Sequence, residues 1–135
     1  METTIERIGD GTTAVVAVTG ELDASNFQNL IDVGRELHAA GTRRLILDLG
    51  GLTYMASSGL VALYSLALIL RGDEPPDPEE GWGAFHAIGT DLEAAAHHGV
   101  KLLRPQASVS RVLERTGLTR FFDVYTDRDA ALASV

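Results

Sequence analysis

Short apolar runs, separated by glycine-containing or polar turns, divide the chain into alternating strand and helix patterns. Residues 12–19 are rich in β-branched side chains and residues 43–49 form a short apolar run, so both are predicted to be buried strands. Between them, apolar residues recur at helical spacing over residues 27–41, which predicts an amphipathic helix. Residues 60–70 are almost continuously apolar, which predicts a buried helix that ends before Gly72.

Weaker patterns complete the order of the elements. The remaining predicted elements are strands at residues 4–8, 100–103 and 121–125, a helix around residues 109–113 that ends at Gly117, a short helix from Thr90 or Asp91 to Ala96, and a short C-terminal helix at residues 130–132 capped by residues 126–129. Strands separated by helices predict right-handed parallel crossovers, and a hairpin turn at residues 9–11 adds an antiparallel pair. The pattern therefore predicts one α/β domain with a mixed sheet over residues 1–135.

The segment of residues 72–90 differs from the rest of the chain in composition. Five acidic residues and three prolines lie between Asp73 and Glu80 with no basic residue among them, so we expect an extended acidic, proline-rich insertion loop. Trp82 and Phe85 follow it. They either pack the loop back onto the domain, which is the ordinary role of such residues, or anchor a partner protein.

Composition excludes several classes of function. The net charge of −8 argues against a nucleic-acid-binding protein, which needs basic side chains to meet phosphates. The chain has no cysteine, so it has neither a disulfide framework nor a thiol nucleophile. The N-terminal residues lack the pattern of a secretory signal, and the longest apolar run is too short to span a membrane. We therefore expect a cytoplasmic protein.

Two adjacent serines, Ser57 and Ser58, mark the start of the predicted helix at residues 60–70. A serine in this position can cap the helix, and the free amide groups there also favour negative charge such as a phosphate. A catalytic nucleophile is the weakest of the three interpretations, because Ala56 and Leu60 occupy the glycine positions of the Gly-x-Ser-x-Gly pattern and no histidine is linked to Ser58. The sequence does not separate the roles of the two serines.

Three other groups favour structural roles. Ser25 with Gln28 fits a capping box for the helix at residues 27–41, and Asp23 is an equally good cap. Gly50-Gly51 is predicted to form a loop, and it is too short for a phosphate-binding or dinucleotide-binding motif. His97-His98 does not predict a metal site, because adjacent helical residues point about 100° apart.

The motifs around the serine pair resemble those of a known family. Asp48-Leu49 followed by residues 55–60, Met-Ala-Ser-Ser-Gly-Leu, is similar to the signature of STAS domains, and especially of bacterial anti-sigma factor antagonists. The resemblance extends to residues 19–23 and to residues 100–118, and it covers most of the chain apart from about residues 73–90. The chain departs from the family at Ala56, where many members carry an acidic residue.

The resemblance implies a STAS-type fold with a mixed four- to five-stranded sheet and helices packed over it. It implies a regulatory protein, not an enzyme, that binds an anti-sigma factor which is also a serine kinase. Ser58 matches the serine that such a kinase phosphorylates, and Asp23, Ser25, Ser57, Ser58 and Gly59 match the partner-binding surface. The chain itself would need no cofactor or metal, since ATP and magnesium would be bound by the kinase. A phosphatase and a second copy of the chain are further candidate partners. The alternative is a STAS adaptor or sensor module, in a signalling or lipid-transport assembly, that is never phosphorylated.

Overall fold

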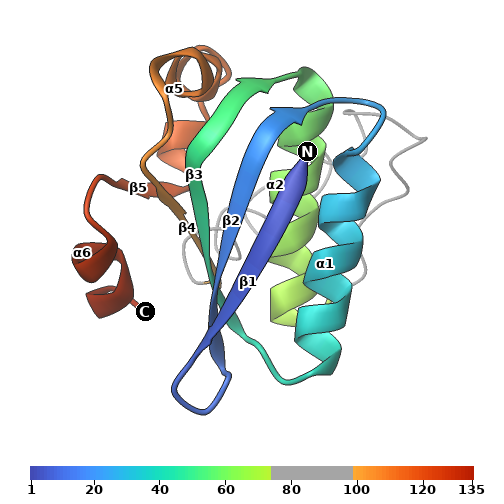
Figure 1. Ribbon diagram of the computed structural model, residues 1–135, viewed down its shortest axis with the longest axis vertical. Coiled ribbons are helices and arrows are strands. Elements are labelled where there is room, and N and C mark those ends of the chain that lie inside the picture. Colours follow the sequence, from blue (N-terminus) through green and yellow to red (C-terminus); the bar gives the residue numbers. More distant parts are fainter. Residues whose placement is uncertain (74–98) are drawn as a thin grey trace.

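The computed structural model describes residues 1–73 and 99–135, which form a five-stranded mixed sheet with helices on both of its faces (Figure 1). The strands are β1 Glu2–Ile8, β2 Thr13–Leu22, β3 Arg44–Met55, β4 Val100–Leu103 and β5 Asp123–Tyr125. The helices are α1 Phe27–Ala39, α2 Ser57–Arg71, α5 Ala107–Arg115 and α6 Arg128–Ala133, with a 3-10 turn, η2, at Leu118–Arg120. The predicted α/β class with a mixed sheet is confirmed.

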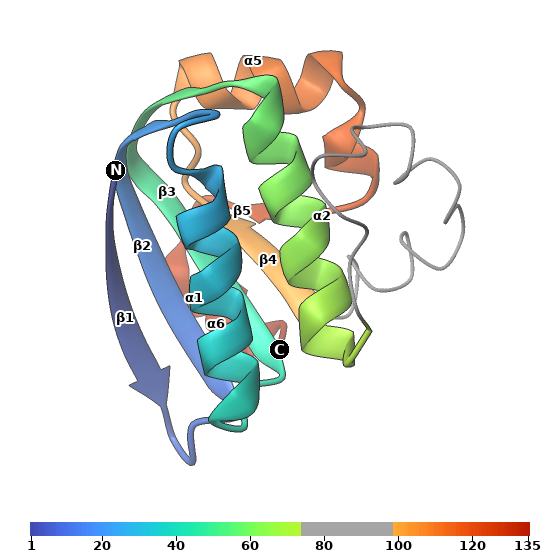
Figure 2. The ribbon, with the colours of Figure 1, turned by 90° about the vertical axis from the view of Figure 1, so that its right-hand side faces the viewer.

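The strands lie in the sheet in their order along the chain. β1 pairs with β2 in antiparallel fashion, and β2, β3, β4 and β5 are parallel neighbours. Each parallel connection needs a crossover, so the carboxyl ends of β2 and β3 come to the same end of the molecule. The loop into α1 and the start of α2 therefore lie at that end (Figure 2).

The main hydrophobic core lies between the sheet and the pair α1 and α2. Residues 59–70 of α2 are all buried, which confirms the prediction that this helix is largely core. A smaller core covers part of the opposite face, where Val15, Ile46 and Leu103 of the sheet contact Ala131 of α6. The rest of that face, toward the carboxyl ends of the strands, has no helix of the described residues packed on it (Figure 1).

The central strand is longer than its apolar pattern predicts. β3 continues through Gly50 and Gly51 as far as Met55, so the prediction of a loop at the glycine pair is wrong. The register between β2 and β3 shifts after Ala17, where Thr19 pairs with Gly51. This irregularity breaks the alternation of buried and exposed positions, which is why the period-two pattern ends early.

Several predicted helix ends also need correction. The N-cap position of α1 is Asn26 and no side chain caps it, so the capping box of Ser25 and Gln28 is not formed. The N-cap position of α2 is Ala56, and neither serine caps the helix. The last strand begins only at Asp123, because the two preceding phenylalanines follow the η2 turn. The predictions for Gly72 and for the cap of α6 are confirmed: Gly72 is left-handed at φ 96°, and Asp127 Oδ1 accepts from Asp129 N.

Most of the predicted acidic insertion at residues 72–90 lies outside the described residues. The same holds for Trp82, Phe85, the short helix predicted at residues 90–96 and the pair His97-His98.

Candidate functional site at the start of helix α2

The paired ends of β2 and β3 bring the loop that follows β2 close to the start of α2, although the two segments lie far apart in the sequence. Leu22, the last residue of β2, pairs with Met55, the last residue of β3. The amide of Ala56 then donates to the carbonyl oxygen of Leu22 at 2.9 Å. This bond fixes the start of α2 beside the Asp23 loop, which we define as residues 23–26. The predicted site residues of the two segments are thereby brought to one end of the molecule.

Gly59 allows α2 to begin this close to the sheet. A Cβ atom at this position would lie 2.4 Å from Met55 Cγ and 3.1 Å from Leu22 Cδ2, far inside normal contact distance. Both neighbours are buried, so neither side chain has free space to move into. Gly59 is thus a packing residue that sets the position of the serine pair in front of it.

The two serines differ in exposure. Ser57 is exposed, whereas Ser58 is half-buried and its Oγ atom is fully buried with no hydrogen-bond partner among the described residues. A buried hydroxyl without a partner is costly and rare in native proteins. The first turn of α2 contains no acidic side chain and has no side-chain cap, so its free amide groups have no anionic neighbour within their own turn.

The hypothesis that Ser58 is a catalytic nucleophile gains no support from His38, the histidine within residues 1–73 and 99–135. His38 lies near the end of α1 and lines a hollow with Ile69, Gly72 and Asp73, at the opposite end of α2 from Ser58. The part of the chain that the structure describes therefore places no imidazole beside the serine pair. The other three histidines lie outside the described residues.

The Asp23 loop is held by its own polar groups. The amide and the hydroxyl of Ser25 both donate to Asp23 Oδ1, at 2.9 and 2.5 Å. These bonds, led by the one from the hydroxyl, lower the pKa of Asp23 below its ordinary value of 3.8. Asn26 Oδ1 accepts from the amide of Asp23 at 3.0 Å, and Asn26 Nδ2 donates to the carbonyl oxygen of Glu21 at 2.8 Å. The loop therefore presents a fixed, ionised carboxylate beside the start of α2.

Sequence reasoning missed two residues at this end of the sheet. Tyr54 is 51% exposed, and it pairs in register with Glu21, which is also exposed. The apolar pattern gives no signal for either residue, because it predicts a loop from Gly50 onward and an end of the preceding strand at Thr19. Only a strand that continues past the glycine pair brings the two side chains together.

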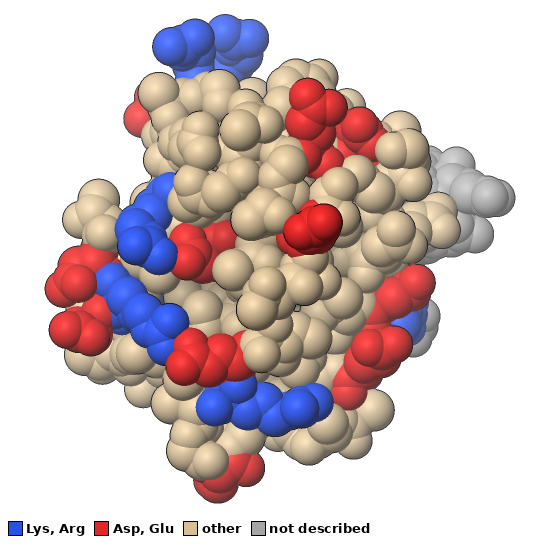
Figure 3. Space-filling view, viewed as in Figure 1, with Lys and Arg blue, Asp and Glu red and all other residues tan. Residues whose placement is uncertain are grey.

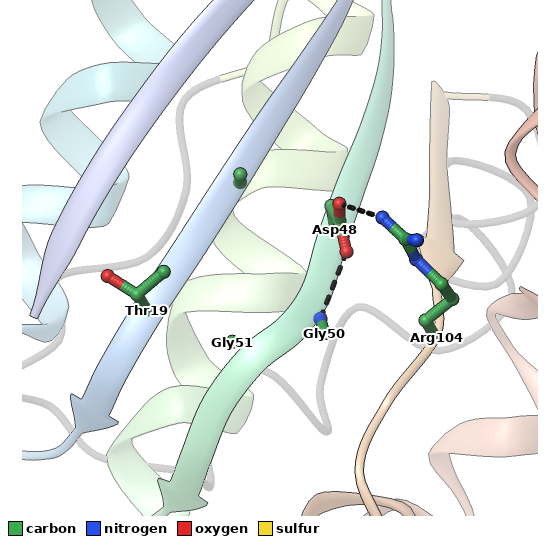
Figure 4. Close-up of a pocket in the computed structure, with 6 residues that line it drawn as sticks. Thr19, Asp48, Gly50, Gly51 and Arg104 are labelled. Atoms are coloured by element: carbon green, nitrogen blue, oxygen red, sulfur yellow. Dashed lines mark hydrogen bonds and ion pairs between the residues drawn. The ribbon is translucent and has the colours of Figure 1, made fainter.

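A separate hollow of about 440 Å³ lies on the uncovered part of the sheet face and is lined by Ala17, Thr19, Asp48, Gly50, Gly51 and Arg104 (Figure 4). Asp48 Oδ2 accepts from Arg104 Nη2 at 2.7 Å, and Asp48 Oδ1 accepts from the amide of Gly50 at 2.9 Å. Arg104 has a φ of 52°, the one positive value outside glycine in the described ranges. The carboxylate of Asp48 thus joins β3 to the end of β4, which is a structural role.

Known proteins share the architecture of this chain. The family model described as "Mlab, STAS domain" matches residues 7–75, which include the Asp23 loop and the serine pair. No curated protein matches the chain. Among solved structures, an anti-sigma factor antagonist from Mycobacterium paratuberculosis is 23% identical, with a TM-score of 0.66 over 99% of this chain and 92% of that one.

Two structures of SpoIIAA are also similar. The anti-sigma factor antagonist SpoIIAA in its unphosphorylated form is 21% identical, with a TM-score of 0.60 over 96% of this chain and 93% of that one. The Bacillus cell fate determinant SpoIIAA in the phosphorylated form is 19% identical, with a TM-score of 0.56 over 99% of this chain and all 100% of that one. At these identities the likeness shows a shared fold.

The five-stranded mixed sheet, with α1 and α2 on one face and the serine pair at the start of α2, defines a STAS-type domain. Since the family model matches half of the chain, the chain belongs to the STAS domain family. Within residues 1–73 and 99–135, no helix is long and apolar enough to cross a bilayer, and no three side chains of His, Cys, Asp or Glu are grouped so that they could hold a metal ion.

Proposed function

We propose that the chain is an anti-sigma factor antagonist, which binds a serine-kinase anti-sigma factor and is released when that kinase phosphorylates Ser58. The observation that supports the proposal is that two segments lie at the same end of a STAS domain. One is the start of α2, with Ser57, Ser58 and Gly59, and the other is the loop that contains Asp23 and Ser25. The chain is then a substrate and not an enzyme, and it needs no cofactor of its own. Magnesium and ATP belong to the kinase.

The surroundings of Ser58 fit a phosphoacceptor that must be uncovered. Its Oγ is buried, but no hydrogen bond of the described residues holds it, so turning the side chain outward breaks no polar contact. The residue itself is half-buried, and Ser57 beside it is exposed. A phosphate on Ser58 would have to project outward from the first turn of α2, where the free amides favour its charge.

Phosphorylation at this position changes the surface that the partner contacts. The phosphate adds about −1.5 to −2 charges at the end of the domain that also carries the carboxylate of Asp23, and it occupies space where the partner would dock. Both effects weaken a complex that formed around the unmodified serines. SpoIIAA, which has the same fold, has been solved in unphosphorylated and phosphorylated forms, and this supports a phosphorylated form of this chain.

The burial of Ser58 Oγ also favours a second candidate function. A STAS adaptor or sensor module that is never phosphorylated would have no need to expose this hydroxyl. Such a module would act as a constant subunit of a signalling or lipid-transport assembly. It would bind its partner equally well with or without ATP.

Titration calorimetry against a serine-kinase anti-sigma factor of the source organism separates the two candidates. The proposal predicts tight binding by the wild type, loss of the complex after incubation with ATP and magnesium, and survival of the complex formed by Ser58→Ala under the same conditions. Glu36→Gln, on the exposed side of α1, is a matched surface control that should behave as the wild type. A wild-type complex that is indifferent to ATP contradicts the phosphorylation switch and supports the adaptor.

A further inference from the structure

Tyr54 is an exposed aromatic side chain at the candidate site. Three large hydrophobic side chains of the described residues are exposed, and Tyr54, at 51%, is more exposed than Ile5 or Val124, each at 40%. Its ring stands at the end of β3, three residues before Ser57. Tyrosines that remain exposed beside a binding surface are often the residues that contribute most to binding.

The backbone that carries Tyr54 is fixed on both sides. The hydroxyl of Thr53 donates to the carbonyl oxygen of Gly20 at 3.0 Å, and the carbonyl oxygen of Thr53 accepts from Ser108 Oγ at 2.8 Å. On the other side, Met55 is buried against the core. The ring is therefore presented from a rigid strand end, so binding to it needs little ordering of the chain.

The charged side chains on the two strand ends around the ring are acidic. Tyr54 and Glu21 are register partners on neighbouring parallel strands, which lie about 4.8 Å apart, so their side chains leave the same surface side by side. The ionised carboxylate of Asp23 follows two residues after Glu21. Neither residues 19–26 nor residues 50–58 contain a lysine or arginine. Acidic side chains gather near the end of β2, and the basic ones at this end lie over α5 (Figure 3).

We propose that Tyr54 and Glu21 together bind one basic side chain of the partner protein. The face of an aromatic ring attracts a cation, and a carboxylate beside it pairs with the same charge. Arginine fits best, because its planar guanidinium stacks on the ring while its N–H groups reach the carboxylate. The inference rests on the proposed function for the identity of the partner, the serine-kinase anti-sigma factor, and adds the chemistry by which this surface recognises it.

Four variants test this contact by calorimetry with the purified kinase. Tyr54→Phe keeps the ring and should bind within about twofold of the wild type. Tyr54→Leu keeps an apolar side chain but removes the aromatic face, and it should bind about tenfold more weakly. Glu21→Gln should also weaken binding about tenfold, and its affinity should depend less on salt than that of the wild type. Val124→Ala, in the edge strand β5, is the control and should bind normally. Thermal unfolding of each variant confirms that it is folded.

The outcomes distinguish this inference from the proposed function. If the wild type binds the kinase but Tyr54→Leu and Glu21→Gln bind equally well, the surface takes no basic side chain, and only this inference is overturned. If Tyr54→Phe binds as weakly as Tyr54→Leu, the phenolic hydroxyl is the contact and the stacking geometry is wrong. If the wild type binds no serine-kinase anti-sigma factor, both proposals fall together.

Discussion

The two ends of helix α2 satisfy their backbone groups in different ways. At its C-terminal end, Gly72 adopts the left-handed conformation and its amide donates to the carbonyl oxygen of Ile69. At its N-terminal end, Ala56 offers no capping side chain, and the hydroxyl of Ser58 is buried with no hydrogen-bond partner among residues 1–73 and 99–135. The first end follows the rules that stabilise helices. The second departs from them at the point where the proposed partner binds, which is where a protein is expected to retain unfavourable local structure.

The largest expected effect comes from Gly59, which lies in the first turn of α2. Gly59→Ala should lower the free energy of unfolding by about 1–3 kcal/mol, because the new Cβ would overlap Met55 and Leu22. Urea unfolding measures the change. The matched control at the other end of the helix is Gly72→Asn, since asparagine tolerates a left-handed backbone and, apart from the chain neighbours, no atom of the described residues lies within 4 Å of an added Cβ. Equal stability of Gly59→Ala and the wild type would show that the first turn is not tightly packed.

Removing the hydroxyl of Ser58 should stabilise the protein, in contrast to the destabilising change Gly59→Ala. Ser58→Ala should raise the free energy of unfolding by about 1 kcal/mol, because it deletes a buried polar atom that has no hydrogen bond in the described structure. Ser57→Ala is the control and should change stability by less than about 0.5 kcal/mol, since Ser57 is exposed. A loss of stability in Ser58→Ala would mean that its hydroxyl has a partner in solution, and the difference between the two helix ends would then disappear.

A smaller gain is expected from capping the first turn. The backbone of Ala56, with φ −82° and ψ 172°, already has the extended shape of an N-cap residue. Ala56→Asp should raise the free energy of unfolding by about 0.5 kcal/mol, by accepting a hydrogen bond from a free amide and by placing a negative charge at the helix start. Ala56→Asn gives the hydrogen bond without the charge, so the difference between the two isolates the charge. No gain from either variant would show that these amides already have a partner.

The parts of the fold with a clear apolar or β-branched signal could be predicted from the sequence. The buried helix α2 and its end at Gly72 follow from a continuous apolar run and a glycine, and β2 follows from its β-branched residues. The continuation of β3 beyond Gly50 could not be predicted, because the register shift against β2 removes the alternation on which strand prediction depends. The pairing of Tyr54 with Glu21 depends on that continuation and was missed with it.

The position of the site was predictable, but its internal geometry was not. Two serines before an apolar helix indicate the helix start from composition alone. Whether a serine caps the helix, or lies buried without a partner, depends on how closely Gly59 lets the first turn approach Met55. Such a contact between two elements leaves no periodic signal. The bond between Ser25 and Asp23 likewise took the place of the capping box that local spacing favoured.

The most direct test of the account is the intact mass of the protein after incubation with its serine-kinase anti-sigma factor, ATP and magnesium. Wild type, Ser57→Ala and Ser58→Ala are measured side by side. We predict one added phosphate on the wild type and on Ser57→Ala, and none on Ser58→Ala. A phosphate that persists on Ser58→Ala but disappears in Ser57→Ala would move the modification to the exposed serine. No phosphate on any of the three, while the wild type still binds the kinase, would contradict the phosphorylation switch.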